Sequence, residues 1–187
     1  MKKFELTNEF VTNMFGTKLF RIRALVEFGD VEAGELGGYV EKESNLGHDD
    51  NAWVYGDARV YDNALVYDNA RVYGDAWVYG DAWVYGNARV CGDALVCGDA
   101  RVCGNGDYAY AHGFGSVNRT TTFFRLKDGG VGVRCGCFYG TLAQFRDKIR
   151  ETHGETKKAQ EYLMLADLME LRFEEDENEV GNRKYVE

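Results

Sequence analysis

A six-residue alternation of apolar and polar positions runs through the middle of the chain. Nine consecutive hexads occupy residues 52–105; each begins with Ala, carries Val at the third position and ends in Gly-Asp, Gly-Asn or Asp-Asn. Neighbouring side chains of a strand point to opposite sides, so Ala and Val face one way and the intervening residue and the following Tyr or Cys face the other. The closing dipeptides tolerate positive φ and favour a turn after each short strand. The pattern predicts a narrow Ala and Val interior with Arg, Trp, Leu, Tyr and Cys outside.

An aliphatic residue followed four places later by a small one repeats from Val54 and Ala58 to Val96 and Ala100. This spacing resembles the hexapeptide repeat of left-handed parallel β-helices. The resemblance implies that three hexads close one triangular coil of about 18 residues, with three full coils in this stretch. The chain departs from the family after the aliphatic residue, where the family's enzymes often have Gly and this chain has Tyr or Cys. Leu36 lies one such coil before Val54 and indicates an irregular first coil.

The sequence therefore predicts an all-β fold, a left-handed parallel β-helix with a small C-terminal α+β appendage made of a β-hairpin and two helices. Upstream of the repeat, residues 18–25 alternate as a strand that would cover the lower end of the β-helix. The expected organisation is an N-terminal strand and cap over 1–35, the β-helix over 36–117, the hairpin and two helices over 118–173, and an acidic tail over 174–187.

The appendage is predicted from turn and capping signals. Residues 120–126 and 131–139 flank a Gly-containing turn and indicate a hairpin with strands on both sides. Thr141 followed by Gln144 is a capping box for a helix to about Thr152. The second helix, over about 156–173, is apolar around so much of its girth that it must be covered twice. We expect the hairpin on one side, and either the end of the β-helix or another subunit on the other.

The outer surface follows from the coil length, because equivalent residues of successive coils stack about 4.8 Å apart. Tyr should then stack on Tyr, and Arg should lie against Trp with about 0.5–1 kcal/mol per exposed pair. Such a surface indicates a site for a planar or anionic ligand, or for another protein; alternatively, the ladders only stiffen the sheet. The candidate binding residues are Trp53, Trp77, Trp83, Arg59, Arg71, Arg89, Arg101, Tyr61 and Tyr79.

Charge and cysteine usage narrow the classes of partner. A net charge of −9 and a pI of about 4.9 argue against nucleic acid as a partner. No signal peptide or membrane span is indicated, so a cytosolic protein with no membrane partner is expected. Five Cys, an odd number, fit a reducing compartment. Cys91, Cys97 and Cys103 should lie on three different sides of one coil, and Cys135 and Cys137 on one face of a strand without a second ligand pair. Neither a metal nor another cofactor is expected.

Catalysis is weighed through the histidines, because the enzymes with this repeat are mostly acyltransferases with a catalytic His at a cleft between trimer subunits. The chain has three, His48, His112 and His153. They are too scattered for the three-His zinc site of the related carbonic anhydrases, and no third group at fixed spacing orients any of them. The chain is therefore expected to be non-enzymatic, with no catalytic residue; His112 is the candidate if it is an acyltransferase.

The order of segments along most of the chain adds a second resemblance. FRIRAL, GELGGYVEKESNL, the hexads, TTTFFRLKDGG, VRCGCFYGTLAQF and YLMLADLMELRF resemble uncharacterised small proteins of bacteriophages and prophages. The leading hypothesis is an accessory binding protein of the host bacterial cytosol. It would sequester a small, nucleotide-like, anionic or planar defence signal, or block a host protein. The alternatives are an acyltransferase and a structural or assembly protein. A homo-oligomer is expected, with a trimer favoured by the fold resemblance.

Overall fold

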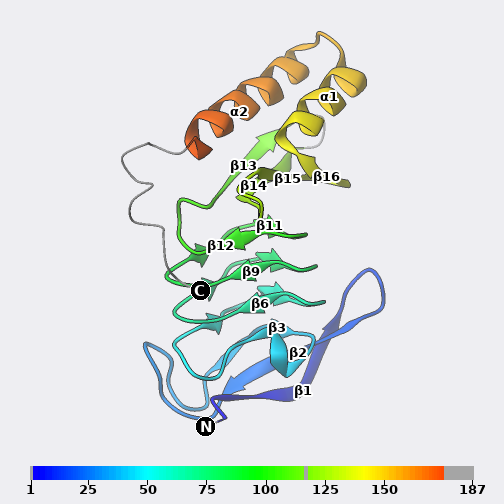
Figure 1. Cartoon of the computed structure of the whole chain (residues 1–187). Helices are drawn as coiled ribbons and strands as arrows, with labels where there is room; N and C mark the ends of the chain where they lie inside the picture. Colours follow the sequence, from blue (N-terminus) through cyan, green and yellow to red (C-terminus); the bar gives the residue numbers. More distant parts are fainter. Residues whose placement is uncertain (1, 116–117, 175–187) are drawn as a thin grey trace.

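The centre of the molecule is a β-solenoid of about four turns with about 18 residues per turn (Figure 1). The computed structural model describes residues 2–115 and 118–174, so most of the predicted acidic tail lies outside the described residues. After β3 (Leu36–Val40) the coils consist of two-residue strands separated by turns. These are β4 (Trp53–Val54), β5 (Arg59–Val60), β6 (Leu65–Val66), β7 (Arg71–Val72), β8 (Trp77–Val78), β9 (Trp83–Val84), β10 (Arg89–Val90), β11 (Leu95–Val96) and β12 (Arg101–Val102).

The strands stack into three parallel sheets, one for each side of the coil. Face 1 consists of β4, β7 and β10; face 2 of β3, β5, β8 and β11; and face 3 of β6, β9 and β12. On face 1, Trp53 pairs with Arg71 and Arg71 with Arg89, so each step is one coil of the predicted length. The predicted coil length and the assignment of each hexad to a side are confirmed.

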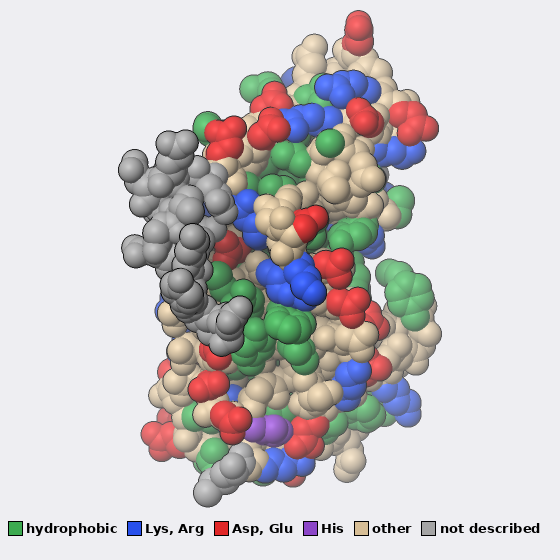
Figure 2. Space-filling view, viewed as in Figure 1, with side chains coloured by type: hydrophobic (Ala, Val, Ile, Leu, Met, Phe, Trp, Pro, Cys, Tyr) green, Lys and Arg blue, Asp and Glu red, His purple; other side chains and the backbone are tan. Residues whose placement is uncertain are grey.

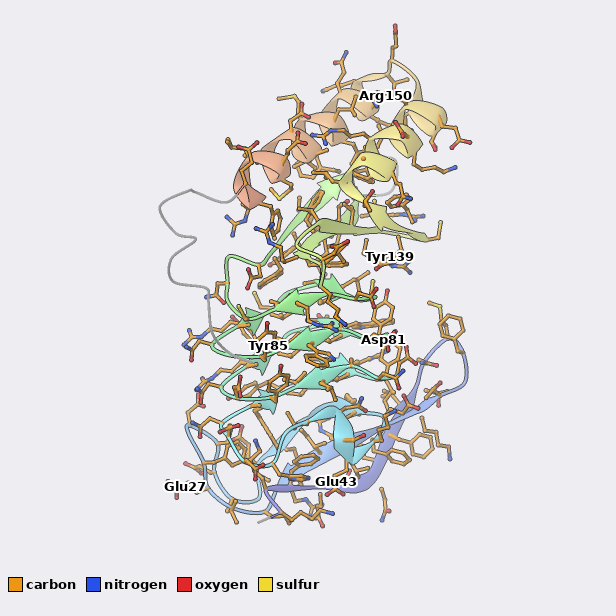
Figure 3. All side chains as sticks on the ribbon, viewed as in Figure 1. Glu27, Glu43, Asp81, Tyr85, Tyr139 and Arg150 are labelled. Carbon is orange, nitrogen blue, oxygen red and sulfur yellow. The ribbon has the colours of Figure 1, made fainter. Side chains whose placement is uncertain are left out.

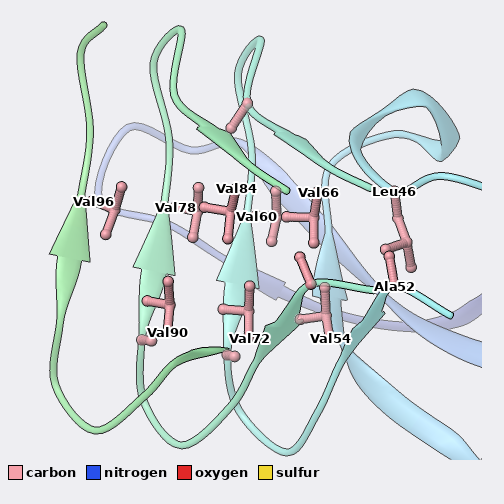
Figure 4. Close-up of a cluster of buried hydrophobic side chains, with 14 of the residues drawn as sticks. Leu46, Ala52, Val54, Val60, Val66, Val72, Val78, Val84, Val90 and Val96 are labelled. Atoms are coloured by element: carbon pink, nitrogen blue, oxygen red, sulfur yellow. The ribbon is translucent and has the colours of Figure 1, made fainter. Parts of the chain in front are cut away.

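Valine and alanine ladders fill the interior (Figure 4). Every hexad Val and every hexad Ala is fully buried, from Ala52 and Val54 to Ala100 and Val102. Each buried Val contributes roughly 1.5–3 kcal/mol, so the stability of the solenoid is distributed over all coils.

The lowest coil departs from the expected register. β3 pairs with β5, with Val40 opposite Val60, and this step is longer than the regular one from Val60 to Val78. Leu36 pairs instead with Arg23 of the cap, so the predicted alignment of Leu36 with Val54 is wrong. A short 3-10 helix, η1 (Glu43–Asn45), lengthens the coil before Leu46 bridges to Val66, again by the longer step.

The N-terminal segment closes the lower end. β1 (Phe4–Thr12) and β2 (Lys18–Ala24) are antiparallel and extend face 2 beyond β3. Phe4 and Ile22 are fully buried beneath the first coil. The Lys3 ammonium donates to the backbone oxygens of Asp50 (2.7 Å) and Ala52 (2.9 Å), satisfying acceptors that have no strand below them.

A four-stranded antiparallel sheet closes the upper end. Its strands are β13 (Tyr108–Phe114), β14 (Arg119–Arg125), β15 (Val131–Cys135) and β16 (Phe138–Thr141), in that order. Phe124 is fully buried in the solenoid core, and the Thr122 hydroxyl accepts the backbone N–H of Leu95. The sequence predicted one strand over 131–139 with both thiols on one face. That expectation is wrong, because Gly136 adopts φ 59° in a turn between β15 and β16.

Two helices cover the other side of this sheet, α1 (Leu142–His153) and α2 (Lys157–Phe173). The predicted capping box is confirmed, since Thr141 accepts from the Gln144 backbone and Gln144 from that of Thr141. Phe123 of the sheet lies in the same buried cluster as Phe145 of α1 and Tyr162 of α2. Among residues 2–115 and 118–174, neither the solenoid end nor another segment covers the opposite side of α2, where Met164, Leu168 and Leu171 are exposed. No described helix is long and apolar enough to cross a membrane.

Candidate functional site

Tyrosine stacks occupy faces 2 and 3. Tyr61 and Tyr79 have ring centroids 5.1 Å apart and an interplanar angle of 2°; Tyr67 and Tyr85 are 5.2 Å apart at 5°. Figure 3 shows Tyr85 on the flank of the coil and Asp81 at a corner. Tyr61 is only 4% exposed, with Leu19 of the cap and Tyr39 of β3 in its cluster, so its predicted display for ligand binding is wrong. The tyrosine stacks are a structural part of the solenoid wall.

The arginines of faces 2 and 3 lie against tryptophans of adjacent coils, as the register of the coils requires. The guanidinium carbon of Arg59 is 5.0 Å from the ring centroid of Trp77, and that of Arg101 is 4.3 Å from Trp83. In the space-filling view, basic side chains lie beside hydrophobic ones in the middle of the visible face (Figure 2). These four candidate binding residues therefore interact within the protein, which reduces what they offer to a ligand.

Trp53 has no exposed surface, so the prediction that it is displayed for binding is wrong. It lies on the first coil of face 1, where residues of the N-terminal cap cover its ring. The rings of Phe4 and Phe28 meet it edge-on, with centroids 6.2 and 5.3 Å away. The indole N–H has no hydrogen-bond partner among the described residues, which fits a side chain buried for packing.

Cavities follow face 1 of the solenoid from coil to coil. Three cavities of about 240, 310 and 520 Å³ line it, and all three include Arg89. Arg71 contributes to the first two and Tyr73 to the last two, so the cavities follow one another along the face. We call this surface the face-1 groove; it is lined chiefly by Asn69, Arg71, Tyr73, Asn87, Arg89 and Tyr110.

One edge of the groove is a column of asparagines at a corner of the solenoid. Positions 51, 69, 87 and 105, which repeat once per coil, are all Asn, whereas the turn positions at 57, 75 and 93 are all Asp. The Asn51 amide donates to Asn69 Oδ1 at 3.0 Å, and Asn105 Oδ1 accepts from the Arg89 backbone at 2.9 Å. These asparagines add hydrogen-bond donors and acceptors to the edge of the groove, and Asp68 in the same turn accepts from the Gly86 backbone at 3.0 Å.

The two groove arginines have different environments. Arg71 is 2.6 Å from Asp30 of the N-terminal cap, and Asp30 also accepts from the Tyr55 hydroxyl at 3.1 Å. Partial burial acts to raise the pKa of Asp30, but the hydrogen bonds from Tyr55 and Arg71 outweigh it and lower that pKa. Within residues 2–115 and 118–174, no carboxylate forms an ion pair with Arg89, although it lines every cavity of the groove. Arg89 is therefore a cation available to an anionic ligand along the whole groove, and Arg172 of α2 adds a second guanidinium to the lining of the largest of the three cavities.

Aromatic rings lie at the upper end of the groove. Tyr73 is 37% exposed and Tyr110 40% exposed, so both present ring surface to solvent. Cys91 lies between coils there, with its sulfur 3.4 Å from the Tyr108 hydroxyl. Hydrogen bonding to this thiol is the main cause of a raised pKa for Tyr73, which keeps that hydroxyl neutral. Exposed rings beside a guanidinium suit a planar anion.

The histidines lie apart from the groove arginines and from one another. His48 stacks on Phe4 and contacts Glu43 at 3.0 Å, and His153 stacks on Tyr162. His112 on β13 is more open. Its Nδ1 lies 2.9 Å from the Thr120 hydroxyl, whereas the Asp93 carboxylate is 3.7 Å away, beyond hydrogen-bond distance, so one group lies within hydrogen-bond reach of the ring.

Sequence reasoning found Arg71 and Arg89 but missed Asn69, Asn87, Tyr73 and Tyr110 as groove residues. The asparagines could have been found from the sequence, since Asn recurs once per coil at positions 51, 69, 87 and 105. The described residues contain no group of three or more His, Cys, Asp or Glu arranged to hold a metal ion.

Comparison with known proteins supports the repeat architecture. No curated protein matches the chain. The family model for the YdcK beta solenoid repeat matches residues 52–67, 58–71, 66–80 and 82–98, all within the hexads. The central part of the chain is thus similar to the YdcK beta solenoid repeat.

Proposed function

We propose that this protein is a non-enzymatic binding protein that holds a small planar anion, of the nucleotide kind, in the face-1 groove. The observation that carries the proposal is Arg89, which lines all three cavities and forms no ion pair with a described carboxylate. Arg71 stands one coil below it, at a spacing of about 4.8 Å. Guanidinium groups bind phosphate and carboxylate through paired N–H donors, which supports an anionic ligand.

The remaining part of the ligand is inferred from the rest of the groove. Tyr73 and Tyr110 offer exposed rings for stacking, and Asn69 and Asn87 offer amide donors and acceptors. Stacking on an aromatic ring contributes about 1–3 kcal/mol per base and requires no particular base. A nucleotide has both the planar group and the negative charge that this combination suits.

The biological setting is part of the same proposal. Resemblance to phage and prophage proteins supports a role in the bacterial cytosol, where the protein would sequester a host signal of this chemistry. The hexapeptide pattern supports left-handed coils. The tryptophans of faces 2 and 3 already stack on arginines, which makes these two faces less suited to the rival role of blocking a host protein.

The proposal is tested by calorimetric titration with adenosine monophosphate, adenosine and inorganic phosphate. We expect the monophosphate to bind more tightly than either fragment, with affinity falling as salt is added. Arg89→Ala should weaken binding about tenfold to a hundredfold. Arg101→Ala is the matched control, since Arg89 and Arg101 occupy the same place in the hexads ARVCGD and ARVCGN on different faces. Absence of saturable binding, or equal losses in both variants, would contradict the proposal.

An acyltransferase is the second candidate, favoured by the contacts of His112. The Thr120 hydroxyl lies 2.9 Å from its Nδ1, with the Asp93 carboxylate 3.7 Å away, so Nε2 is left as the nitrogen that a general base would use. This function predicts that acetyl-coenzyme A raises the melting temperature and that His112→Ala abolishes acetyl transfer. An unchanged melting temperature, with intact binding at the face-1 groove, would leave the binding protein as the function.

A further inference from the structure

The outward side of α2 carries an apolar stripe. Met164, Leu168 and Leu171 are 71%, 54% and 67% exposed, and their successive spacings, four and then three, place them on one side of the helix. The buried residues of α2, such as Tyr162 and Ala166, lie on the opposite side. Three large apolar side chains in one row on a charged protein indicate a contact surface.

The charged residues beside the stripe differ between its two flanks. On the flank next to α1, Arg146 forms ion pairs with Asp167 at 2.8 Å and Glu170 at 2.7 Å, so these charges are matched within the chain. On the other flank are Glu161 and Arg172. Glu161 has only a 3.9 Å contact with the highly exposed Lys157, and the Arg172 guanidinium contacts a backbone oxygen, that of Asn105, at 3.4 Å.

Glu161 and Arg172 lie about three helical turns apart, roughly 16.5 Å along the axis. They are at opposite ends of the stripe and on the same flank of it. If two such helices pack side by side in opposite directions, the Glu161 end of one lies against the Arg172 end of the other. If they pack in the same direction about a two-fold axis, opposite flanks meet, so Glu161 of one helix faces the flank of Asp167 and Glu170 of the other and gains no ion pair with Arg172.

We propose that α2 binds α2 of a second copy of this chain in an antiparallel, two-fold symmetric contact. The stripe of one copy packs on the stripe of the other, with Leu168 near Met164 of the second copy. A two-fold contact uses the same patch twice, so it forms both Glu161–Arg172 ion pairs at once. Antiparallel packing also places the positive end of each helix dipole beside the negative end of the other. The contact makes dimers, in contrast to the trimer expected from the fold resemblance.

The first test measures the mass of the full chain by sedimentation velocity from micromolar to near-millimolar concentration. We expect a dimer in equilibrium with monomer. Leu168→Glu should give monomer at every concentration, because two carboxylates would be buried against apolar side chains. Leu168 is exposed in the single chain, so an unchanged circular dichroism spectrum and melting temperature of the diluted variant verify that it folds.

A charge exchange identifies the partner surface and its direction. Glu161→Arg and Arg172→Glu should each raise the dimer dissociation constant about tenfold, since each variant places like charges together at both symmetric positions. The double variant should restore the wild-type constant. Glu155→Arg, the same change in the turn before α2, is the control and should have no effect.

Several results would overturn the proposal. A wild-type chain that stays monomeric would do so, as would a trimer whose mass does not respond to Leu168→Glu. Single charge variants that weaken the dimer without rescue by the double variant would exclude the antiparallel alignment.

Discussion

Faces 1 and 3 of the solenoid are built from nearly the same hexads but present different surfaces. On face 3, Arg101 lies over Trp83 and Tyr85 over Tyr67, so the outward groups are satisfied by their neighbours. On face 1, the residue above Arg71 is Arg89 and the residue below it is a covered Trp53. The role of an outward residue therefore depends on its neighbours in the coils above and below, more than on its own hexad.

The largest test of this comparison uses the tryptophans at equivalent hexad positions. Trp53→Ala should lower the free energy of unfolding by about 3–5 kcal/mol, because it empties a fully buried site between Phe4 and Phe28. Trp83→Ala, 38% exposed on face 3, should cost much less. Urea unfolding followed by circular dichroism measures both. Similar losses in the two variants would mean that the N-terminal cap does not distinguish the faces.

Alkaline pH should reveal the buried tyrosine stacks of faces 2 and 3. Burial raises the pKa of Tyr61 and of Tyr67 to about 12, against about 10 in an unfolded chain. The fold favours the neutral phenol, so this contribution to stability is complete below pH about 10 and is lost between about 10 and 12. For Tyr61, 4% exposed, the loss is on the order of 2 kcal/mol.

Urea unfolding at pH about 9 and about 11 measures this alkaline loss. Tyr61→Phe should reduce the difference between the two pH values, because phenylalanine keeps the stacked ring and cannot ionise. Tyr73→Phe on face 1 should reduce the difference less, since Tyr73 is 37% exposed whereas Tyr61 is 4% exposed. A difference that Tyr61→Phe leaves unchanged would show that other groups cause the alkaline loss.

The Arg–Trp contact is accessible to a double-mutant cycle. Arg101 and Trp83 should show a coupling of about 0.5–1 kcal/mol, as expected for a partly exposed cation–π pair. Arg89 with Arg71 on face 1 should show no favourable coupling, because the two groups carry like charge. Chemical denaturation of the single and double variants gives both values. A favourable coupling between Arg89 and Arg71 would remove the distinction between the faces.

The smallest stability change is expected at the asparagine corner. Asn69→Asp should alter the free energy of unfolding by only a few tenths of a kcal/mol, since the side chain is exposed and its acceptor oxygen is kept. It should nevertheless weaken binding of an anion to the face-1 groove, because it adds a carboxylate beside Arg71 and Arg89. Asn63→Asp, at a different corner, is the control for binding only, because this change also removes the hydrogen bond that Asn63 donates to Asp81 at 3.1 Å. Equal binding by all three proteins would exclude the Asn corner from the site.

The repeat could be predicted because its determinants are local. Ala and Val must alternate to fit a narrow interior, and the register between coils then follows for Arg59 with Trp77 and Arg101 with Trp83. The environment of Trp53 could not be predicted in the same way. Phe28, which covers it, belongs to an irregular loop whose position depends on long-range packing.

The binding site could be predicted only where its residues belong to the repeat. Arg71 and Arg89 stand out from the hexads, but the hollow around them exists because Asp30 and Tyr110 arrive from segments outside the repeat. The longer step at the base likewise depends on η1 and on cap residues that no hexad specifies.

Because every hexad places the same Ala and Val in the interior, hexads can be removed without changing the core. What the removal changes is the angular position, around the solenoid axis, of the segments that follow. Removing three consecutive hexads would shorten the rod by one layer, about 4.8 Å, and keep the two caps in their present angular relation. Removing a single hexad above Asp81 would leave the interior equally well filled but turn everything beyond it by one side of the prism. Asn105 would then stand over Asp81 instead of Asn87, and the α2 stripe would point in a new direction relative to the lower cap. Such a chain can therefore gain or lose whole coils of three hexads and still keep the same outward residues stacked on each face.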